Sequence, residues 1–277
     1  MAALVPLDNA DSTASTPVAF TLYQGVLFAA EHARRPVHSR TKTGLDLVNF
    51  LLAGLAQRYT RLTFCLHHEF IDLRSFSWFH YHEPERGQFR LSLQYTGLVH
   101  LTDYASFQDY VSSTREVRRQ EFRRGEKAGL KVEAIDDVSL FESLYRKTFE
   151  RQGVNINPAL IERMRRVTTA ALTHGFGELL CCRLPSGEPA SITLFLYDDR
   201  CGYYLFAAND PARRNSGSGT YLMFENIRRC HARGLKWVDF CGINSPNRGD
   251  FKTSFNANTV PYFEASWKTP SRDVAAS

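Results

Sequence analysis

The chain has 277 residues, and its 34 Lys and Arg residues against 29 Asp and Glu residues give a formal net charge of +5. Apolar residues make up 43% of the chain, and its 20 Phe and 12 Tyr residues provide enough bulk for a large core. This composition excludes a chain that is disordered throughout, and 17 Gly and 11 Pro without a repeat period exclude a collagen-like architecture. The length suits one large domain or two small ones.

Residues 1–17 are rich in Ala, Ser, Thr and Asp, and are predicted to form a loose tail. Apolar residues at helical spacing predict a helix over 43–59. Alternating and aromatic-rich segments predict strands over 61–66, 75–81 and 89–95.

The composition changes at 106–128, where one helix is predicted, with a capping box at Ser113 and Glu116 and a stop at Gly129. Its basic segment 115–127 alternates Arg with Glu, so ion pairs one turn apart explain it as a solvated helix. Contact with an RNA backbone or another polyphosphate is the alternative. We place a domain junction here, which divides the chain into units 18–112 and 113–277.

The remaining elements alternate regularly, and Asn157 followed by Pro158 is typical of a helix start. Helices are predicted over 138–152, 158–174, 219–233 and 249–256. Strands are predicted over 130–134, 178–184, 189–197, 201–208, 235–241 and 260–267. This order predicts an α/β (α+β) fold with a mixed sheet.

The six cysteines form no C-x-x-C pair, so common zinc-ribbon spacing is absent and we expect small buried thiols. Histidines gather at 67–69 and 80–83, but no H-E-x-x-H pattern occurs and we expect no metal. Residues 1–17 lack the segments of a signal peptide, and no apolar run is long enough to cross a bilayer. We therefore expect a cytoplasmic protein without a membrane span, and no DNA partner.

A glycine-bearing loop, Arg214-Asn-Ser-Gly217-Ser-Gly219, lies between a predicted strand and a predicted helix. The first turn of a helix has free N–H groups and favours negative charge, and nearby arginines add to this. The pattern is typical of a phosphate or diphosphate site. A flexible connection is the alternative, because short glycine patterns recur by chance.

This spacing resembles R/Q-x-x-G-x-G/A, the pyrophosphate loop of the GNAT acyltransferase superfamily. Trp237-Val-Asp-Phe240, with Phe251-Lys-Thr-Ser-Phe255 after it, is similar to the end of the Fem-type and BioF2-like branch. There a D-F-G strand end precedes F-K-x-x-F; here Cys241 interrupts the first pattern. The resemblance covers residues 113–267, and implies that 18–112 is a reduced GNAT-like unit.

The resemblance implies a gap between two parallel strands, 201–208 and 235–241, that holds the arm of an acyl-CoA donor. The donor's pyrophosphate would then contact a group of cofactor-binding residues. These are Arg213, Arg214, Gly217, Ser218 and Gly219.

Three residues near this gap are candidate catalytic residues. By the resemblance, Lys252 lies at the active site, where it could neutralise an oxyanion; the alternative is a surface lysine. Asp239 is a base or substrate anchor, or equally a cap for the next turn. Tyr204 faces the cleft, or is a core aromatic residue with a bonded hydroxyl.

The acceptor pocket is predicted to lie between the two units. Asp72, Arg74 and Trp78 are candidates for its lining, although an Asp–Arg pair beside a buried Trp is an equal interpretation. The other candidates are Tyr95, Asn244 and Phe251, and Asn244 also fits a turn residue.

The leading hypothesis is an N-acyltransferase that moves an acyl group from acyl-CoA to an amine: an amino sugar, a nucleotide sugar or a peptide. The first alternative is a Fem-type transferase that takes its group from aminoacyl-tRNA. The second is a non-catalytic binding module on the same fold. Neither a G-x-S-x-G serine hydrolase motif nor a P-loop occurs.

Overall fold

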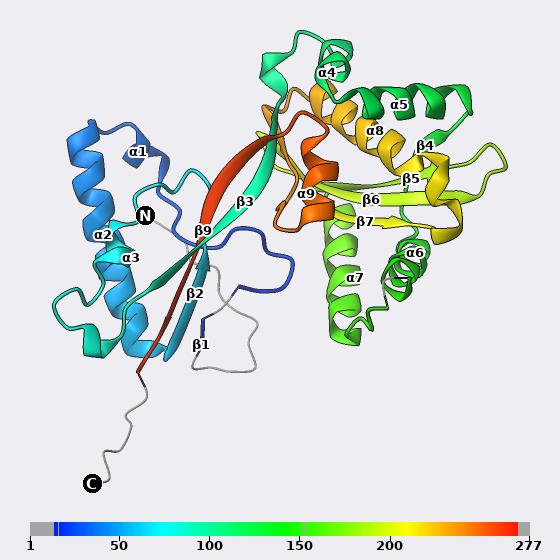
Figure 1. Cartoon of the computed structure of the whole chain (residues 1–277). Helices are drawn as coiled ribbons and strands as arrows, with labels where there is room; N and C mark the ends of the chain where they lie inside the picture. Colours follow the sequence, from blue (N-terminus) through cyan, green and yellow to red (C-terminus); the bar gives the residue numbers. More distant parts are fainter. Residues whose placement is uncertain (1–13, 16, 152, 271–277) are drawn as a thin grey trace. The chain divides into compact units, whose positions relative to one another are not determined.

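The computed structural model describes residues 14–15, 17–151 and 153–270. The chain forms two compact units, one of residues 1–95 with 261–277 and one of residues 96–260 (Figure 1). The chain passes between them within strands β3 (Arg90–His100) and β9 (Asn258–Lys268). The compact units therefore divide elsewhere than at the predicted junction after residue 112, and the GNAT-like nature of the N-terminal unit stays a prediction.

The first unit is built around strand β2 (Arg61–Cys65). It pairs antiparallel with β9, from Arg61 opposite Lys268 to Cys65 opposite Glu264, and parallel with β1 (Ala14–Ser15). The predicted tail otherwise lies mostly outside the described residues. The helical elements of this unit are α1 (Ala30–Ala33), α2 (Val37–Arg58), α3 (Arg74–Ser77) and η1 (Pro84–Arg86). Its core is mostly aromatic and aliphatic, including Leu52, Leu62, Phe64, Phe76 and Trp267.

The strand predicted over 75–81 is wrong, because this segment forms α3 and the turns after it. In a strand, Phe76 and Trp78 would share one face. Instead Phe76 is fully buried and Trp78 is exposed, and the Trp78 amide donates to the Arg74 carbonyl oxygen at 2.8 Å. The aromatic alternation suggested a strand, but one helical turn satisfies the backbone, buries Phe76 together with Ser75, and leaves Trp78 exposed.

The second unit contains a mixed sheet in the order β3-β8-β7-β6-β5-β4. All neighbours in it are antiparallel except β7 and β8, which are parallel. Cys182 and Cys201 lie on β5 and β7 with β6 between them, and all six cysteines are free. The strands are β4 (Lys131–Ile135), β5 (Gly177–Arg183), β6 (Pro189–Tyr197), β7 (Cys201–Asn209) and β8 (Trp237–Asp239).

Helices cover both faces of this sheet, with α4, α5 and α8 on one side and α6 and α7 on the other (Figure 1). As predicted, Asn157 caps α7, since its side chain accepts a hydrogen bond from the Ala159 amide at 2.9 Å. The bounds are η2 (Leu101–Asp103), α4 (Phe107–Ser113), α5 (Glu116–Lys127), α6 (Val138–Glu150), α7 (Pro158–Thr173), η3 (Pro211–Ser216), α8 (Ser218–Ala232) and α9 (Pro246–Thr253).

The single helix predicted over 106–128 is in fact two helices, α4 and α5. The break lies at Thr114 and Arg115, where the Arg115 amide donates to the Ser254 carbonyl oxygen at 3.0 Å. The predicted capping box is also wrong. Ser113 donates to the Tyr110 carbonyl oxygen, and Arg115 precedes α5 without a side-chain cap. A tertiary hydrogen bond, which local spacing does not encode, thus divides the helix.

Helix α5 packs closely on α8 because Gly125 has no side chain. A Cβ atom there would lie 2.6 Å from the Tyr221 ring. On the same face, Phe122 stacks on Tyr221 with ring centroids 5.3 Å apart. Glycine inside a helix ordinarily costs about 1 kcal/mol relative to alanine, and this close approach explains its presence.

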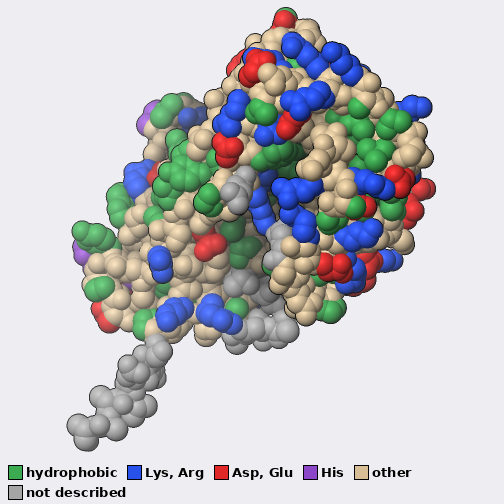
Figure 2. Space-filling model, turned by 45° about the vertical axis from the view of Figure 1, so that its right-hand side comes forward, with side chains coloured by type: hydrophobic (Ala, Val, Ile, Leu, Met, Phe, Trp, Pro, Cys, Tyr) green, Lys and Arg blue, Asp and Glu red, His purple; other side chains and the backbone are tan. Residues whose placement is uncertain are grey.

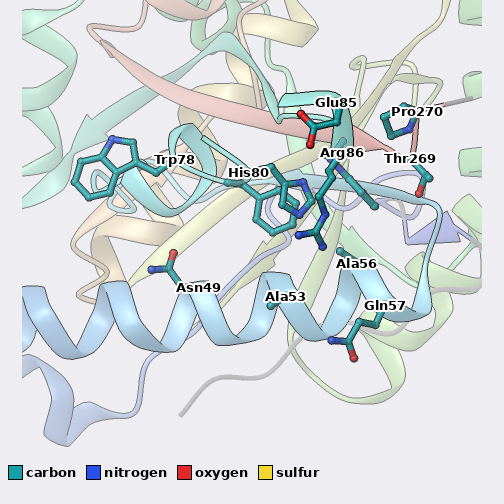
Figure 3. A pocket seen from close by; sticks show the side chains of 12 residues that line it. Asn49, Ala53, Ala56, Gln57, Trp78, His80, Glu85, Arg86, Thr269 and Pro270 are labelled. Atoms are coloured by element: carbon teal, nitrogen blue, oxygen red, sulfur yellow. The ribbon is translucent and has the colours of Figure 1, made fainter. Parts of the chain in front are cut away.

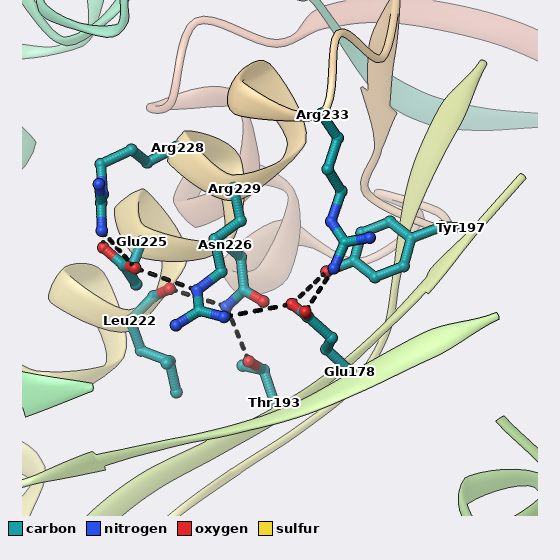
Figure 4. A network of polar contacts seen from close by, with 9 residues as sticks. All are labelled: Glu178, Thr193, Tyr197, Leu222, Glu225, Asn226, Arg228, Arg229 and Arg233. Carbon is teal, nitrogen blue, oxygen red and sulfur yellow. Dashed lines mark hydrogen bonds and ion pairs between the residues drawn. The ribbon is translucent and has the colours of Figure 1, made fainter. Parts of the chain in front are cut away.

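The C-terminal half of α8 is fixed to the sheet by a polar network around Glu178 of β5 (Figure 4). The Glu178 carboxylate accepts hydrogen bonds from Arg233, from Arg229 at 3.5 Å and from the Tyr197 hydroxyl at 3.2 Å. In the interior, the Asn226 amide donates to the Thr193 hydroxyl at 2.8 Å. These contacts hold the axis of α8, and therefore also the position of its N-terminus.

Candidate functional site

The two parallel strands of the sheet separate after a short paired stretch. Pairing runs from Cys201 opposite Trp237 to Tyr203 opposite Asp239, where β8 ends. Strand β7 continues to Asn209. After β8, however, the Phe240 amide donates its hydrogen bond to the Gly97 carbonyl oxygen of β3, at 2.9 Å, and not to β7. The predicted separation of these strands is therefore present, and it begins at Tyr204.

A tight turn at the end of β8 is held by Asp239, which is 1% exposed. One of its carboxylate oxygens accepts hydrogen bonds from the Thr96 hydroxyl and from the Cys241 amide, the latter at 2.7 Å. The Gly242 amide donates to the Thr96 hydroxyl at 3.1 Å. These contacts favour the turn-capping interpretation of Asp239, and they support a left-handed backbone at Cys241, with φ of 54°.

Lys252 of α9 approaches the same turn from its other side. Its Nζ atom donates to the carbonyl oxygens of Phe240 at 2.7 Å and Gly242 at 2.8 Å. It also lies 5.4 Å from the centre of the Tyr204 ring. Burial lowers the pKa of Lys252, and the positive charge of Arg248 lowers it further. Lys252 is thus a half-buried cation at the separation of the strands and not a free surface lysine.

Tyr204 packs in the core beside this cation, with its ring edge-on to Phe240 at 5.9 Å. Burial raises the pKa of Tyr204, and the nearby Cys241 thiol adds to the effect. Its hydroxyl therefore stays protonated at neutral pH and can act as a hydrogen-bond donor.

The predicted anion-binding loop ends at the N-terminus of α8. Gly217 precedes the helix with φ of 75°, a conformation that favours glycine. Ser218 is buried, and its hydroxyl is 2.6 Å from the Ser191 hydroxyl. A Cβ atom on Gly219 would lie 3.0 Å from the Asn209 amide oxygen. The glycines allow the chain to turn here, and the buried serine hydroxyls form hydrogen bonds with one another beneath the loop.

The two neighbouring arginines have different environments. Arg213 pairs with Glu188 at 2.6 Å, so its charge is partly compensated. Arg214 is exposed, and its side chain makes no hydrogen bond or ion pair within the described part of the chain. Of the predicted pair, Arg214 is thus the one available to a ligand.

Three further residues surround the first turn of α8: Arg118 and Glu121, which belong to the predicted basic segment, and Thr220, which the sequence did not single out. The Thr220 hydroxyl donates to the Glu121 carboxylate at 2.6 Å and accepts from Arg118 at 3.0 Å. The Arg118 guanidinium lies 5.0 Å from the Phe251 ring centre. Glu121 and Arg118 therefore supply charge of both signs here. The signal in the sequence was the Arg-rich helix, but only its packing on α8 places these two side chains.

The predicted substrate residues are distributed over both units. Arg74 binds the Asp72 carboxylate with two hydrogen bonds, at 2.8 and 2.6 Å, and this lowers the pKa of Asp72. The Arg74 guanidinium lies 5.4 Å from the Trp78 ring centre. The Asp–Arg pair is thus present, but Trp78 is exposed and not buried as one interpretation expected.

The other three candidates for substrate binding lie on different elements of the chain. Tyr95 is partly exposed on β3, and Asn244 is exposed in the loop between β8 and α9. Phe251 packs on Phe255 with ring centroids 5.1 Å apart. Their roles in substrate binding stay predictions.

The structure also bears on metals and membranes. Over residues 14–15, 17–151 and 153–270, no group of three or more His, Cys, Asp or Glu side chains is arranged to hold a metal ion. None of the helices in these ranges has the length and apolar character needed to span a bilayer.

The family model for the acetyltransferase (GNAT) domain matches residues 112–253, which include both the α8 loop and Lys252. The chain belongs to the GNAT acetyltransferase family. The match begins where the predicted GNAT resemblance begins, and it confirms the recognition of the family from its pyrophosphate-loop spacing. No curated protein matches the chain in sequence.

Solved structures share this GNAT-like fold. FemX is 13% identical, with a TM-score of 0.65, and the likeness covers 89% of this chain and 82% of FemX. The C-terminal domain of a proposed lysylphosphatidylglycerol synthetase from Agrobacterium fabrum is 14% identical, with 80% and 72% covered and a TM-score of 0.53. L-PGS from Bacillus licheniformis is 11% identical, with the same coverage and TM-score. The predicted likeness to the Fem-type branch is thus confirmed for the fold.

Proposed function

We propose that the protein transfers an acyl group from a CoA thioester to an amine. The observation that carries this proposal is the end of β7–β8 pairing at Tyr203, on the same strand that leads into the α8 loop. Beyond Tyr203, β7 has backbone groups on its β8 side that an extended pantetheine arm can bind. The free N–H groups of α8 and the unpaired Arg214 suit the diphosphate of the same donor.

The transfer needs few groups from the protein. The amine nitrogen attacks the thioester carbonyl carbon, a C–N bond forms, and the C–S bond breaks. The nitrogen loses a proton to water, and the leaving thiolate gains one from the protein, which water then replaces. Tyr204, which stays protonated, is proposed to donate to that thiolate, and Lys252 to lower the energy of the oxyanion through its positive charge. Asp239 is proposed to hold the turn that positions Lys252.

The acceptor is proposed to be an amino sugar, a nucleotide sugar or a peptide amine, and the protein is proposed to act in the cytoplasm. Competition among these amines in one transfer assay, with acetyl-CoA as the donor, identifies the class. Absence of transfer to every amine by the unaltered protein would favour the non-catalytic alternative, whereas unchanged transfer by Lys252→Met would exclude a catalytic role for Lys252.

The decisive experiment is a calorimetric titration with acetyl-CoA and longer acyl-CoA thioesters. Arg214→Ala is expected to weaken binding about tenfold, since a charge-assisted contact to phosphate is lost. Arg213→Ala is the matched control, because Glu188 already engages that arginine, and its effect should be smaller. Absence of binding by every acyl-CoA at millimolar concentration would contradict the proposed donor.

One observation favours aminoacyl-tRNA as an alternative donor. Arg123, Arg124 and Lys127 are exposed on the C-terminal half of α5 and make no ion pair within the described residues. The other arginines of α5 are paired, and Figure 2 shows basic and acidic side chains side by side over the helices at the top of the view.

This alternative predicts tRNA binding that weakens steeply with added salt. The double variant Arg123→Glu/Arg124→Glu should abolish it, whereas Arg119→Gln, in which an already paired arginine is replaced, should change it little. If charged tRNA neither binds at low salt nor yields a transferred amino acid, aminoacyl-tRNA is excluded as the donor.

A further inference from the structure

A groove with a volume of about 670 Å³ runs along helix α2 of the first unit (Figure 3). Its volume lies in the range of small-molecule sites, which is roughly 300–1,000 Å³. Ala53 and Ala56 of α2 lie on its floor, and their small side chains leave the space open. The groove shares no residue with the strand separation or the α8 loop, so its ligand is a separate question from the acyl donor.

One wall of the groove is a rigid aromatic corner. The Gly87 carbonyl oxygen accepts hydrogen bonds from His80 Nδ1 at 2.8 Å and Trp267 Nε1 at 3.2 Å. His80 has φ of 53°, a left-handed conformation that costs a non-glycine residue roughly 1–2 kcal/mol. Because a carbonyl oxygen only accepts, Nδ1 of His80 carries the hydrogen of this contact. These two hydrogen bonds to the Gly87 carbonyl oxygen fix the positions of the His80 and Trp267 rings in this wall.

Trp78 stands at one end of the groove, and Figure 3 shows it above α2 near Asn49. Its side chain is 52% exposed. Its one ring contact within the described residues is the Arg74 guanidinium. A large indole left in water loses the free energy that burial would give, so its exposure is informative. A ligand that covers this ring would recover that free energy.

Two neutral amides mark the length of the groove. Asn49 and Gln57 are exposed and lie eight residues apart on α2, and their side chains make no hydrogen bond within the described ranges of the chain. At 1.5 Å per residue, this separation is about 12 Å along the helix. An elongated ligand can therefore meet an aromatic ring and amide groups at successive points.

The charges of the lining select the class of ligand. Arg86 already forms an ion pair with Glu83, and Glu85 adds a carboxylate to the lining, so these residues leave no uncompensated cation for an anionic ligand. A peptide that binds by adding a strand to a sheet is excluded along this wall, because α2 bonds its own backbone groups internally. Sugar rings present apolar C–H faces to aromatic rings and hydroxyls to amides. We propose that this groove binds a neutral saccharide of at least two rings, stacked on Trp78 and hydrogen-bonded to Asn49.

The test titrates the full chain with cellobiose, maltose and N,N′-diacetylchitobiose, without acyl donor, while tryptophan fluorescence and heat are recorded. At least one disaccharide is expected to bind and to change the emission. Trp78→Ala should weaken this binding about tenfold or more, because the stacking surface is lost. Ala53→Leu should weaken it similarly, because it fills the floor and leaves Trp78 in place.

Phe50→Ala is the matched control, since Phe50 is an exposed aromatic residue on the same helix that does not line the groove. It should bind like the unaltered protein. The proposal is overturned if no disaccharide binds at about 20 mM. It is also overturned if Trp78→Ala and Ala53→Leu bind as well as the unaltered protein, or if short peptides compete and sugars do not. These measurements do not involve acyl transfer, so they can fail or succeed separately from the proposed function.

Discussion

Two regions near the ends of β7 and β8 differ in how their polar groups are used. In the turn at 239–242, Asp239, Thr96 and Lys252 bind the backbone of the turn itself. In the loop before α8, the serine hydroxyls bind one another beneath the surface, while Arg214 is exposed and unpaired. The polar groups of the first region are therefore occupied in holding its shape, whereas the second region leaves a positive charge exposed. Substitutions in the turn should mainly change stability, and substitutions in the loop should mainly change binding.

The largest expected effect is that of Asp239→Ala. It leaves the Cys241 amide and the Thr96 hydroxyl buried without their acceptor, which should lower the free energy of unfolding by about 3 kcal/mol. Urea denaturation measures this loss. Asp239→Asn keeps an acceptor oxygen and should cost clearly less, whereas equal losses in the two variants would show that charge and not turn capping is required.

Lys252→Met should have the next largest effect on stability. Two carbonyl oxygens lose a charge-assisted donor, while the relief of burying a charge offsets part of the cost, so a loss of about 2 kcal/mol is expected. Denaturation and transfer assays on the same sample separate its two roles. A variant with intact stability but no transfer would mean that Lys252 acts only on the substrate, and the two regions would then be less distinct than we infer.

In the α8 loop, Arg214→Ala is expected to weaken acyl-CoA binding about tenfold and to change the free energy of unfolding by less than about 0.5 kcal/mol. Calorimetric titration and urea denaturation measure the two quantities. A large loss of stability without a loss of binding would mean that Arg214 holds the loop together and does not bind the donor, contrary to the difference inferred between the turn and the loop.

Gly217→Ala should be milder, because the loop keeps its charges. An alanine at φ of 75° costs about 1 kcal/mol, and a Cβ atom there has the Glu121 backbone oxygen at 3.9 Å as its nearest contact. Thermal denaturation measures this cost. Gly187→Ala, at another positive-φ glycine with nothing near its Cβ, is the control, and it should cost a similar amount without any change in acyl-CoA binding.

The smallest expected effect is a pH dependence that originates from Lys252. Burial holds its folded-state pKa below the ordinary value, so the folded protein releases this proton before the unfolded chain does. The free energy of unfolding of the unaltered protein, relative to Lys252→Met, should therefore rise as the pH increases through the lowered pKa. It should level off once the unfolded lysine also loses its proton. A difference that stays constant from pH 7 to about pH 10 would mean that Lys252 is not desolvated.

Two predictions that depend on neighbouring residues were confirmed, whereas two that depend on contacts between distant residues were wrong. The strand 189–197 has the predicted bounds and the helix after Asn157 begins where predicted, because alternation and capping are properties of adjacent residues. The helix predicted over 106–128 failed because its break depends on Ser254, far along the chain. The strand predicted over 75–81 failed because burial of Phe76, and not alternation, determines that segment.

The sequence by itself determined the family, the strand-and-helix order from β4 to β9, and the glycine and serine pattern of the loop from Arg214 to Gly219, since these are written in contiguous residues. Only the tertiary structure decided which polar side chains are already occupied. Glu188 engages Arg213 while Arg214 is left unpaired, Asp239 and Lys252 meet on one turn, and an aromatic corner forms beside α2. The physical reason is that a side chain's partners, burial and pKa depend on residues that are distant in the chain and meet only when it folds.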